Sequence, residues 1–254
     1  MQIDMNSDLG ESFGNYHLGN DDVILPIITS ANIACGFHAG DPLVMEQTVR
    51  LAVDSGTRLG AHPGLPDLVG FGRREMKISP REAYTAVLYQ VGALAAFAQA
   101  AGTHLQHVKP HGALYNMASR DYVLAEAIAM AVKAIDPGLI LYGLAGGELI
   151  HAAEKVRLRS ASEVFADRRY MDDGSLMPRS QAGAVLADEA EATAQALRMA
   201  RDGEVVTASG KVLKVKADTI CIHGDTPKAI AFAQHIRQAF LDAGVQVTAS
   251  GDFV

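Results

Sequence analysis

Short apolar or β-branched runs alternate with helical stretches along this chain of 254 residues. The strand-like runs cover residues 3–5, 30–35, 59–61, 105–108, 139–144, 164–165, 219–222 and 245–248. Such alternation is typical of parallel strands that are joined by right-handed crossovers through helices. The pattern therefore predicts an α/β fold with about eight strand candidates, close to the number that a (β/α) barrel needs.

Capping signals predict where the helices begin and end. Asp41 can cap a helix that has Pro42 at its first position and that ends before Gly56. Residues 79–82 match a capping box with proline at the first helical position, and the alanine-rich helix after them runs to about Ala101. Further helices are predicted over residues 121–135, 146–154, 188–201 and 227–243.

A closed barrel and an open doubly wound sheet both fit this alternation. No G-x-G-x-x-G follows the first strand, which favours the barrel. One segment differs from the rest, because residues 204–216, with Ser209-Gly210 near their centre, predict a β-hairpin. No linker, low-complexity stretch or internal repeat divides the chain. We therefore expect residues 1–254 to form one barrel domain with a β-hairpin excursion near 204–216.

Composition excludes several classes of protein. Hydrophobic residues make up 49% of the chain and charged residues 20%, which is an ordinary balance for a globular protein with a large core. The net charge is -7 and no Lys/Arg block occurs, which argues against partners such as nucleic acid or a membrane surface. No apolar stretch approaches the roughly 20 residues that span a bilayer, and no signal peptide is expected before the first strand-like run. Cys35 and Cys221 lie in apolar runs as expected of buried free thiols, so a cytoplasmic location is predicted.

Ionisable or amide side chains follow six of the apolar runs. They are Asn6, Ser7, Asp8 and Glu11; His38 and Asp41; His62; Lys109, His111 and Asn116; Asp167 and Arg168; and His223 and Asp225. Because parallel strands place their carboxyl ends on one face, these side chains are predicted to meet at one rim of the barrel. Acids, histidines and a lysine on one rim indicate an enzyme.

The strongest of these clusters is residues 109–116. Lys109 can neutralise an anion or a developing oxyanion, and His111 can transfer a proton. Pro110 and Gly112 frame the pair rigidly, as is typical of catalytic positions. Asp8 is a candidate general base, metal ligand or substrate clamp, with the satisfaction of backbone amides in the 10–14 loop as the alternative.

The remaining candidates have competing structural interpretations. His38 and His62 are framed by glycines or by Pro-Gly and favour a functional site, although a buried imidazole often serves only as a structural donor. Asp41 is better explained as a helix cap. Arg168 and Arg179 can bind a carboxylate or phosphate bidentately, or form surface ion pairs. Five histidines lack such framing and are expected to be structural or exposed: His17, His104, His107, His151 and His235.

Several catalytic signatures are missing from the sequence. It has no G-x-x-x-x-G-K-[ST] phosphate loop, no H-E-x-x-H, no G-x-S-x-G and no C-x-x-C, so a serine or cysteine nucleophile has no support. These absences do not exclude a metal site with nitrogen and oxygen ligands. Its candidate ligands are Asp8, His38, His62 and His223, whose spacing matches no recognised signature.

Taken together, the motifs resemble the LamB/YcsF family. The resemblance rests on residues 6–11, 30–41, 60–63, 108–115, 163–168 and 222–225 and on Arg179, and it covers essentially the whole chain. It implies an irregular barrel of the glycoside hydrolase/deacetylase type with seven to eight mostly parallel strands, since such barrels often have seven strands rather than eight. It also implies the ATP-driven cleavage of 5-oxo-L-proline to L-glutamate, with ATP consumed as co-substrate and magnesium accompanying it, in a complex with 5-oxoprolinase subunits B and C.

The implied chemistry assigns roles to the rim. Asp8 with His62 or His111 would handle protons, and Lys109 would stabilise the phosphorylated lactam oxygen. The expected substrate-binding residues are Asn6, Glu11, His38, Asn116, Asp167, Arg168, Arg179, His223 and Asp225, with Arg168 or Arg179 on the substrate carboxylate. A metal-dependent amide hydrolase or deacetylase that needs no ATP, and a non-catalytic substrate-binding subunit, remain alternatives. The need for a bound metal and the formation of a homo-oligomer stay open.

Overall fold

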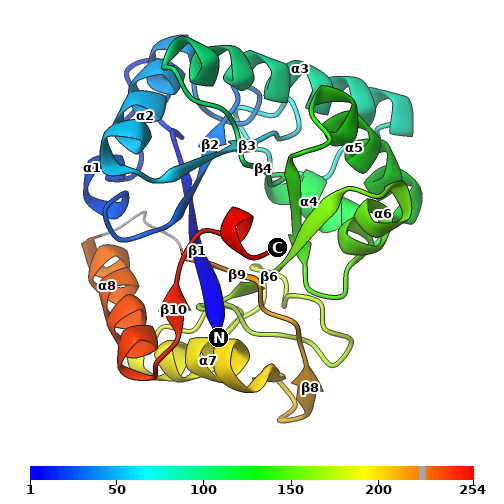
Figure 1. The fold of residues 1–254 in the computed structure, drawn as a ribbon. Helices are drawn as coiled ribbons and strands as arrows, with labels where there is room; N and C mark the ends of the chain where they lie inside the picture. The colour runs from blue at the N-terminus through cyan, green and yellow to red at the C-terminus, as the bar shows by residue number, and fades with distance from the viewer. Residues whose placement is uncertain (223–226) are drawn as a thin grey trace.

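The protein is a closed parallel β-barrel surrounded by helices (Figure 1). The computed structural model describes residues 1–222 and 227–254. In that part of the chain the barrel strands are β1 (Gln2–Leu9), β2 (Ser30–Ala34), β3 (Arg58–His62), β4 (His107–Val108), β5 (Ile140–Leu144), β6 (Arg159–Phe165) and β9 (Thr219–Cys221). Strand β9 pairs with both β6 and β1 and so closes the ring. The predicted irregular barrel is confirmed, and among the described residues it has seven strands.

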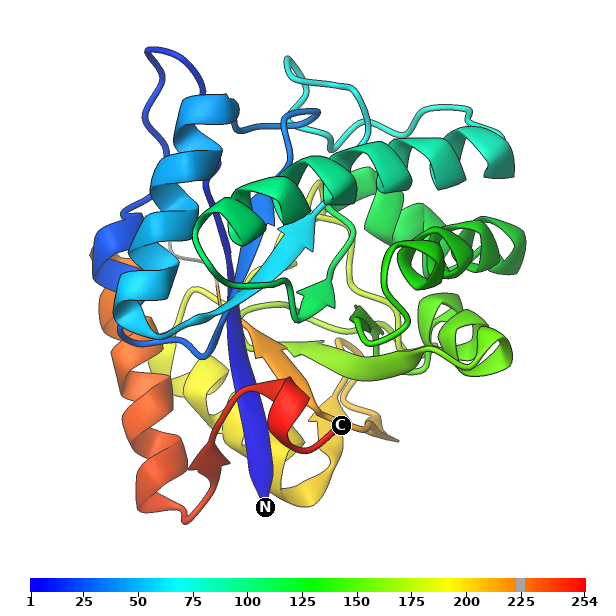
Figure 2. The same cartoon turned by 45° about the horizontal axis from the view of Figure 1, so that its top comes forward.

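The last predicted strand lies outside this ring. Strand β10 (Gln246–Val247) pairs in parallel with the first residues of β1, next to Gln2 and Ile3. The chain then ends in a 3-10 turn, η1 (Ser250–Asp252), which lies near the amino end of the barrel strands in both views (Figures 1 and 2). The apolar composition of residues 245–248 predicted a strand, and a strand forms there. Its pairing with the beginning of β1 places it outside the closed ring.

Helices cover the outside of the barrel, as Figure 2 shows. They are α2 (Pro42–Ser55), α3 (Pro80–Ala100), α5 (Tyr122–Ile135), α6 (Glu148–Val156), α7 (Glu189–Asp202) and α8 (Pro227–Asp242). The predicted caps form: Asp41 accepts hydrogen bonds from the amides of Leu43 and Val44, and Ser79 with Glu82 makes a reciprocal capping box. Two short helices, α1 (Asp21–Ile24) and α4 (Gly112–Ala118), were not predicted. Segments this short do not show the repeating spacing of apolar residues that identifies a helix in a sequence.

The amino end of the barrel interior is closed by a hydrogen-bonded polar cluster. Asp4 is fully buried and accepts hydrogen bonds from the hydroxyls of Thr29, Ser30, Tyr142 and Thr219. Burial raises the pKa of this carboxyl above its usual value, and the donated hydrogen bonds oppose that shift. This cluster is enclosed, so the accessible polar residues of the interior lie at the other end, where the strands terminate.

The predicted hairpin forms apart from the barrel. Strands β7 (Glu204–Val206) and β8 (Val212–Lys214) pair antiparallel as a separate two-stranded sheet. Tyr170, from the segment after β6, bridges to Thr207 beside the hairpin. Across the described residues, no helix has both the length and the apolar character needed to cross a membrane.

Candidate active site at the carboxyl rim of the barrel

A buried lysine joins carboxylates from two strands at the centre of the rim. Lys109 follows β4, and its Nζ lies 3.0 Å from Asp8 Oδ1 and 2.8 Å from Glu163 Oε1. The same nitrogen donates to Asn6 Oδ1 at 3.1 Å and contacts Cys221 Sγ at 3.2 Å. Burial would lower the pKa of Lys109, but Asp8, Cys221 and Glu163 outweigh it and raise that pKa well above its usual value. These contacts therefore hold Lys109 as a buried cation.

Strand periodicity explains why these side chains meet. Alternate residues of a strand point to the same side, so Asp4, Asn6 and Asp8 of β1 all face the barrel interior. In the register between β1 and β2, Asp8 lies opposite Asn32. The Asn32 amide donates to Asn6 Oδ1 at 2.7 Å and to Asp8 Oδ1 at 2.9 Å. One oxygen of Asp8 is thus held by Lys109 and Asn32.

Two imidazoles face each other beside the second oxygen of Asp8. His62 Nδ1 lies 2.7 Å from the carbonyl oxygen of Lys109, and His111 Nε2 lies 2.8 Å from that of Phe71. A carbonyl can only accept, so each of these nitrogens donates its hydrogen. The remaining nitrogens, His62 Nε2 and His111 Nδ1, are 2.9 Å apart, and in neutral rings both present lone pairs. Two lone pairs at that distance repel unless a proton or a cation lies between them.

A third histidine stacks on this pair. The rings of His38 and His111 are parallel, with centroids 3.6 Å apart, and His38 Nε2 lies 3.2 Å from Glu11 Oε1. Burial, with smaller effects from neighbouring groups, lowers the pKa of His38 well below its usual value and that of His111 to about 3. Both rings are consequently neutral at pH 7.

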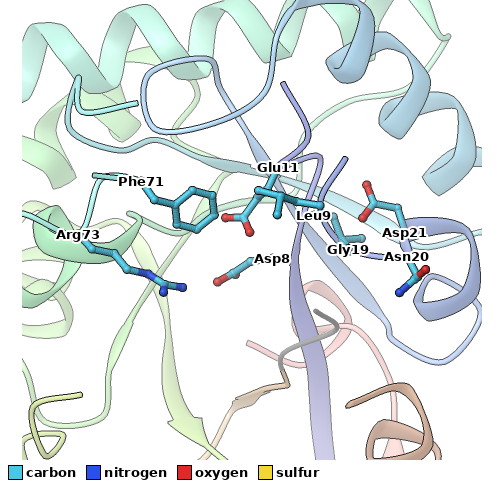
Figure 3. A pocket seen from close by; sticks show the side chains of 9 residues that line it. Asp8, Leu9, Glu11, Gly19, Asn20, Asp21, Phe71 and Arg73 are labelled. Atoms are coloured by element: carbon cyan, nitrogen blue, oxygen red, sulfur yellow. The ribbon is translucent and has the colours of Figure 1, made fainter. Parts of the chain in front are cut away.

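A pocket of about 320 Å³ opens at this cluster. Its lining residues are Asp8, Leu9, Glu11, Leu18, Gly19, Asn20, Asp21, Phe71 and Arg73. Figure 3 shows the Arg73 guanidinium turned toward the carboxylates of Asp8 and Glu11. Phe71 supplies an apolar wall, and the Arg73 guanidinium lies 5.0 Å from the centre of its ring. The pocket thus combines acids, a cation and an aromatic face, which suits a small polar ligand.

The loop that carries Phe71 and Arg73 is held close to the histidines. Gly72 has a φ of +62°, and a Cβ there would lie 2.7 Å from the Cβ of His38 and 2.9 Å from Cδ2 of His111. Only glycine allows that approach. Asp67 anchors the same loop by accepting the Gly70 amide and by pairing with the Arg74 guanidinium.

The structure brings together the predicted residues Asp8, Glu11, His38, His62, Lys109 and His111. Asn6 is fully buried beneath Lys109, where it donates to Glu163 and Thr219. Asn116 is exposed on α4 and does not line the pocket. The Arg168 guanidinium donates to the carbonyls of Met177 and Ala184, and neither Arg168 nor Asp167 nor Arg179 lines the pocket. The candidates His223 and Asp225 lie outside the described residues.

The sequence analysis did not assign Glu163, Asn32 or Arg73 to the site. Glu163 had a detectable signal, because a charged residue directly before the apolar pair Val164-Phe165 of β6 is costly to bury unless it has a partner in the barrel interior. Asn32 is a similar polar residue within β2, and Arg73 follows Gly72 in the loop after β3. His107, expected to be structural or exposed, is buried and stacks on Tyr142, with its Nε2 2.7 Å from Asn32 Oδ1.

Fold and site together define a (β/α) barrel protein that has, at the carboxyl ends of its strands, a pocket of acids, a cation and an aromatic face beside a cluster of buried imidazoles. The model of the LamB/YcsF family matches residues 3–253, and the chain belongs to that family.

Named relatives agree with this membership. The chain is 58% identical over 248 residues to the A subunit of 5-oxoprolinase from Bacillus subtilis (strain 168), covering 98% of this chain and 96% of the relative. It is 59% identical to the A subunit of 5-oxoprolinase from Tolumonas auensis, over 98% and 99% of the two chains.

Solved structures are also similar. The lactam utilization protein from Thermus thermophilus matches with a TM-score of 0.93 at 51% identity, over 98% of this chain and 100% of that one. A T48 deacetylase, at a TM-score of 0.52 and 14% identity over 98% of this chain and 88% of that one, shares the fold alone.

Proposed function

We propose that this chain opens the ring of 5-oxo-L-proline to give L-glutamate, as the A subunit of an ATP-dependent 5-oxoprolinase with subunits B and C. The observation that carries the proposal is the Asp8 carboxylate, which borders the pocket and is fixed by Lys109 and Asn32 from below. The names of the relatives, the A subunit of 5-oxoprolinase and a lactam utilization protein, support a lactam as the substrate.

The site supplies a base for water attack on a lactam. Amide resonance makes the lactam carbonyl a weak electrophile. Transfer of a phosphoryl group from ATP to its oxygen would activate the carbon. Water would then add, and the ring C–N bond would break as the nitrogen takes up a proton, which leaves an acyl phosphate of the opened chain. A second water would release phosphate from it and give glutamate. Asp8 accepts the proton of the attacking water. The sequence has no phosphate loop, so we assign most of the ATP and magnesium site to the partner subunits.

Lys109 acts through Asp8 in this scheme. An ammonium group has three donors, and those of Lys109 face oxygens of Asp8, Glu163 and Asn6. These contacts leave no donor for the phosphorylated lactam oxygen that the resemblance assigned to it. Lys109 instead keeps Asp8 ionised and aligned.

The direct test measures glutamate release from 5-oxo-L-proline with and without ATP, first by this chain alone and then with subunits B and C. We expect glutamate only when ATP and both partners are present. Release by this chain alone without ATP would replace the proposal with an independent amide hydrolase. Binding of 5-oxo-L-proline here, with turnover that survives substitution of Asp8, would make the chain a substrate-binding subunit.

Arg73 is the proposed partner of the substrate carboxylate. Unlike Arg168 and Arg179, it lines the pocket, and its guanidinium is turned toward Asp8 and Glu11 (Figure 3). A guanidinium binds a carboxylate with two parallel hydrogen bonds. Such a contact would place the lactam ring between Phe71 and the Asp8 carboxylate.

Substitution Arg73→Met should raise the KM for 5-oxo-L-proline with little change in kcat. Hydrogen bonds to charged groups contribute about 1.5–3 kcal/mol, which corresponds to an increase of about 10- to 150-fold. Steady-state kinetics of the assembled complex measure the effect. Arg50→Met is the matched control, because Arg50 is exposed on α2 and pairs with Glu46. An unchanged KM in Arg73→Met would exclude Arg73 as the carboxylate partner.

A further inference from the structure

Three potential metal ligands converge beside the proposed base. His62 Nε2 and His111 Nδ1 are 2.9 Å apart, and Glu11 Oε1 lies 3.7 Å from His111 Nδ1. Within the described residues, one ligand atom from each of Glu11, His38, His62 and His111 lies within 4.8 Å of all the others. Ligand atoms about 2.0–2.1 Å from one tetrahedral zinc ion are about 3.3 Å apart, which lies between the two distances measured here.

The outer nitrogens of the two histidines are fixed as in metal sites. Metal-bound imidazoles usually donate their second N–H to a carbonyl or carboxylate, which sets the tautomer and aims the free lone pair at the ion. His62 does this with the carbonyl of Lys109, and His111 with the carbonyl of Phe71. The same backbone contacts leave the two inner nitrogens as acceptors. A cation between them removes the repulsion of their lone pairs.

Ring geometry separates His38 from the ligand set. An imidazole binds a metal in the plane of its ring, but the planes of His38 and His111 are parallel to within 3° and stacked 3.6 Å apart. One ion cannot lie in both planes. His38 Nε2 instead lies against Glu11 Oε1 at 3.2 Å, where it orients the carboxylate.

We propose that His62 Nε2, His111 Nδ1 and the Glu11 carboxylate bind one divalent transition-metal ion of the zinc type. Two imidazoles and one carboxylate with a remaining open position are a ligand set of catalytic zinc sites. Glu11 and Asp8 both line the pocket, and Asp8 Oδ2 lies 3.3 Å from His62 Nε2, so the proposed site borders both the pocket and the base. This site goes beyond the proposed function, and of the metal candidates named from the sequence it retains only His62.

Calorimetric titration of Zn²⁺ into untagged, chelator-treated protein tests the site directly. We expect saturable binding of one ion per chain. Titration with Co²⁺ should give visible d–d absorption, which reports nitrogen and oxygen ligands without any reliance on activity. Absence of one-to-one binding of both ions would overturn the proposal.

Variants identify the ligands. His62→Gln and His111→Gln should each weaken Zn²⁺ binding by at least about 100-fold, whereas His38→Gln, which only positions Glu11, should weaken it by about 10- to 100-fold. His107→Gln is the matched control, because His107 is another buried imidazole that lies outside the cluster. Binding that survives both His62→Gln and His111→Gln would refute the ligand assignment. If a histidine variant fails to fold, Glu11→Gln replaces it as the ligand variant, because the Glu11 side chain is 13% exposed.

The outcome is independent of the lactam reaction. One-to-one metal binding with no glutamate formation in the assembled complex would retain this inference and reject the proposed function. Glutamate formation by protein that binds neither ion would do the reverse.

Discussion

Substitution Lys109→Met is expected to lower glutamate release by about 10³-fold or more, because Asp8 loses the cation that keeps it charged and aligned. The fold should weaken as well. Glu163 is fully buried and lies 2.8 Å from Lys109 Nζ, and a buried carboxylate left without its partner costs about 3–5 kcal/mol. Chemical denaturation measures this loss, and the glutamate assay of the assembled complex measures turnover.

The double variant Lys109→Met with Glu163→Gln separates these two effects. Neutralising Glu163 removes the unpaired charge, while the amide oxygen can still accept from Asn6. We expect most of the lost stability to return and turnover to stay low. Recovery of turnover together with stability would show that Lys109 serves only the fold.

Substitution Asp8→Asn is expected to lower kcat by about 10³-fold, within the 10²- to 10⁴-fold range of general base catalysis. An amide has nearly the shape of the carboxylate but cannot accept the proton of water. Its oxygen can still accept from Asn32 and Lys109, so the variant should fold. Burst and steady-state kinetics of the complex, with 5-oxo-L-proline binding measured in parallel, distinguish lost chemistry from lost binding.

Asp21→Asn is the matched control for Asp8→Asn. Asp21 lines the same pocket from α1, and its Oδ2 accepts the Gly10 amide, a role that an asparagine oxygen can take over. We expect less than about a tenfold change in kcat there, because Asp21 has no part in the proposed proton transfer. If Asp8→Asn behaved like this control, another group would have to be the base.

Much of the fold could be predicted from local signals. The capping box at Ser79, the Asp41 cap and the glycine after α2 depend on residues within a few positions of one another, so they can be read from the chain. The closure of the barrel could not be predicted in this way. It depends on β9 pairing with β1, which joins Thr219 to Asp4 across almost the whole sequence.

The positions of polar residues relative to the predicted strands also identified most of the residues at the carboxyl rim. Asp8, His62, Lys109 and His111 each follow or end a strand, and parallel strands deliver such residues to one face whatever their spacing. Glu163 and Asn32 could be assigned to the site only from the register between strands, because the pairing decides which polar residue of a strand contacts Lys109 or Asp8. Arg73 reaches the pocket from a loop whose path is set by Gly72 and Asp67.

The sequence by itself thus determined the parallel α/β architecture, the family, and the chemical groups at the carboxyl ends of the strands, since these follow from local periodicity and from motif identity. Tertiary structure decided how those groups are used. It placed the donors of Lys109 on oxygens of Asn6, Asp8 and Glu163, and it turned His62 Nε2 and His111 Nδ1 toward each other. Donor direction and ring orientation depend on contacts between residues far apart in the chain, and no local pattern contains them.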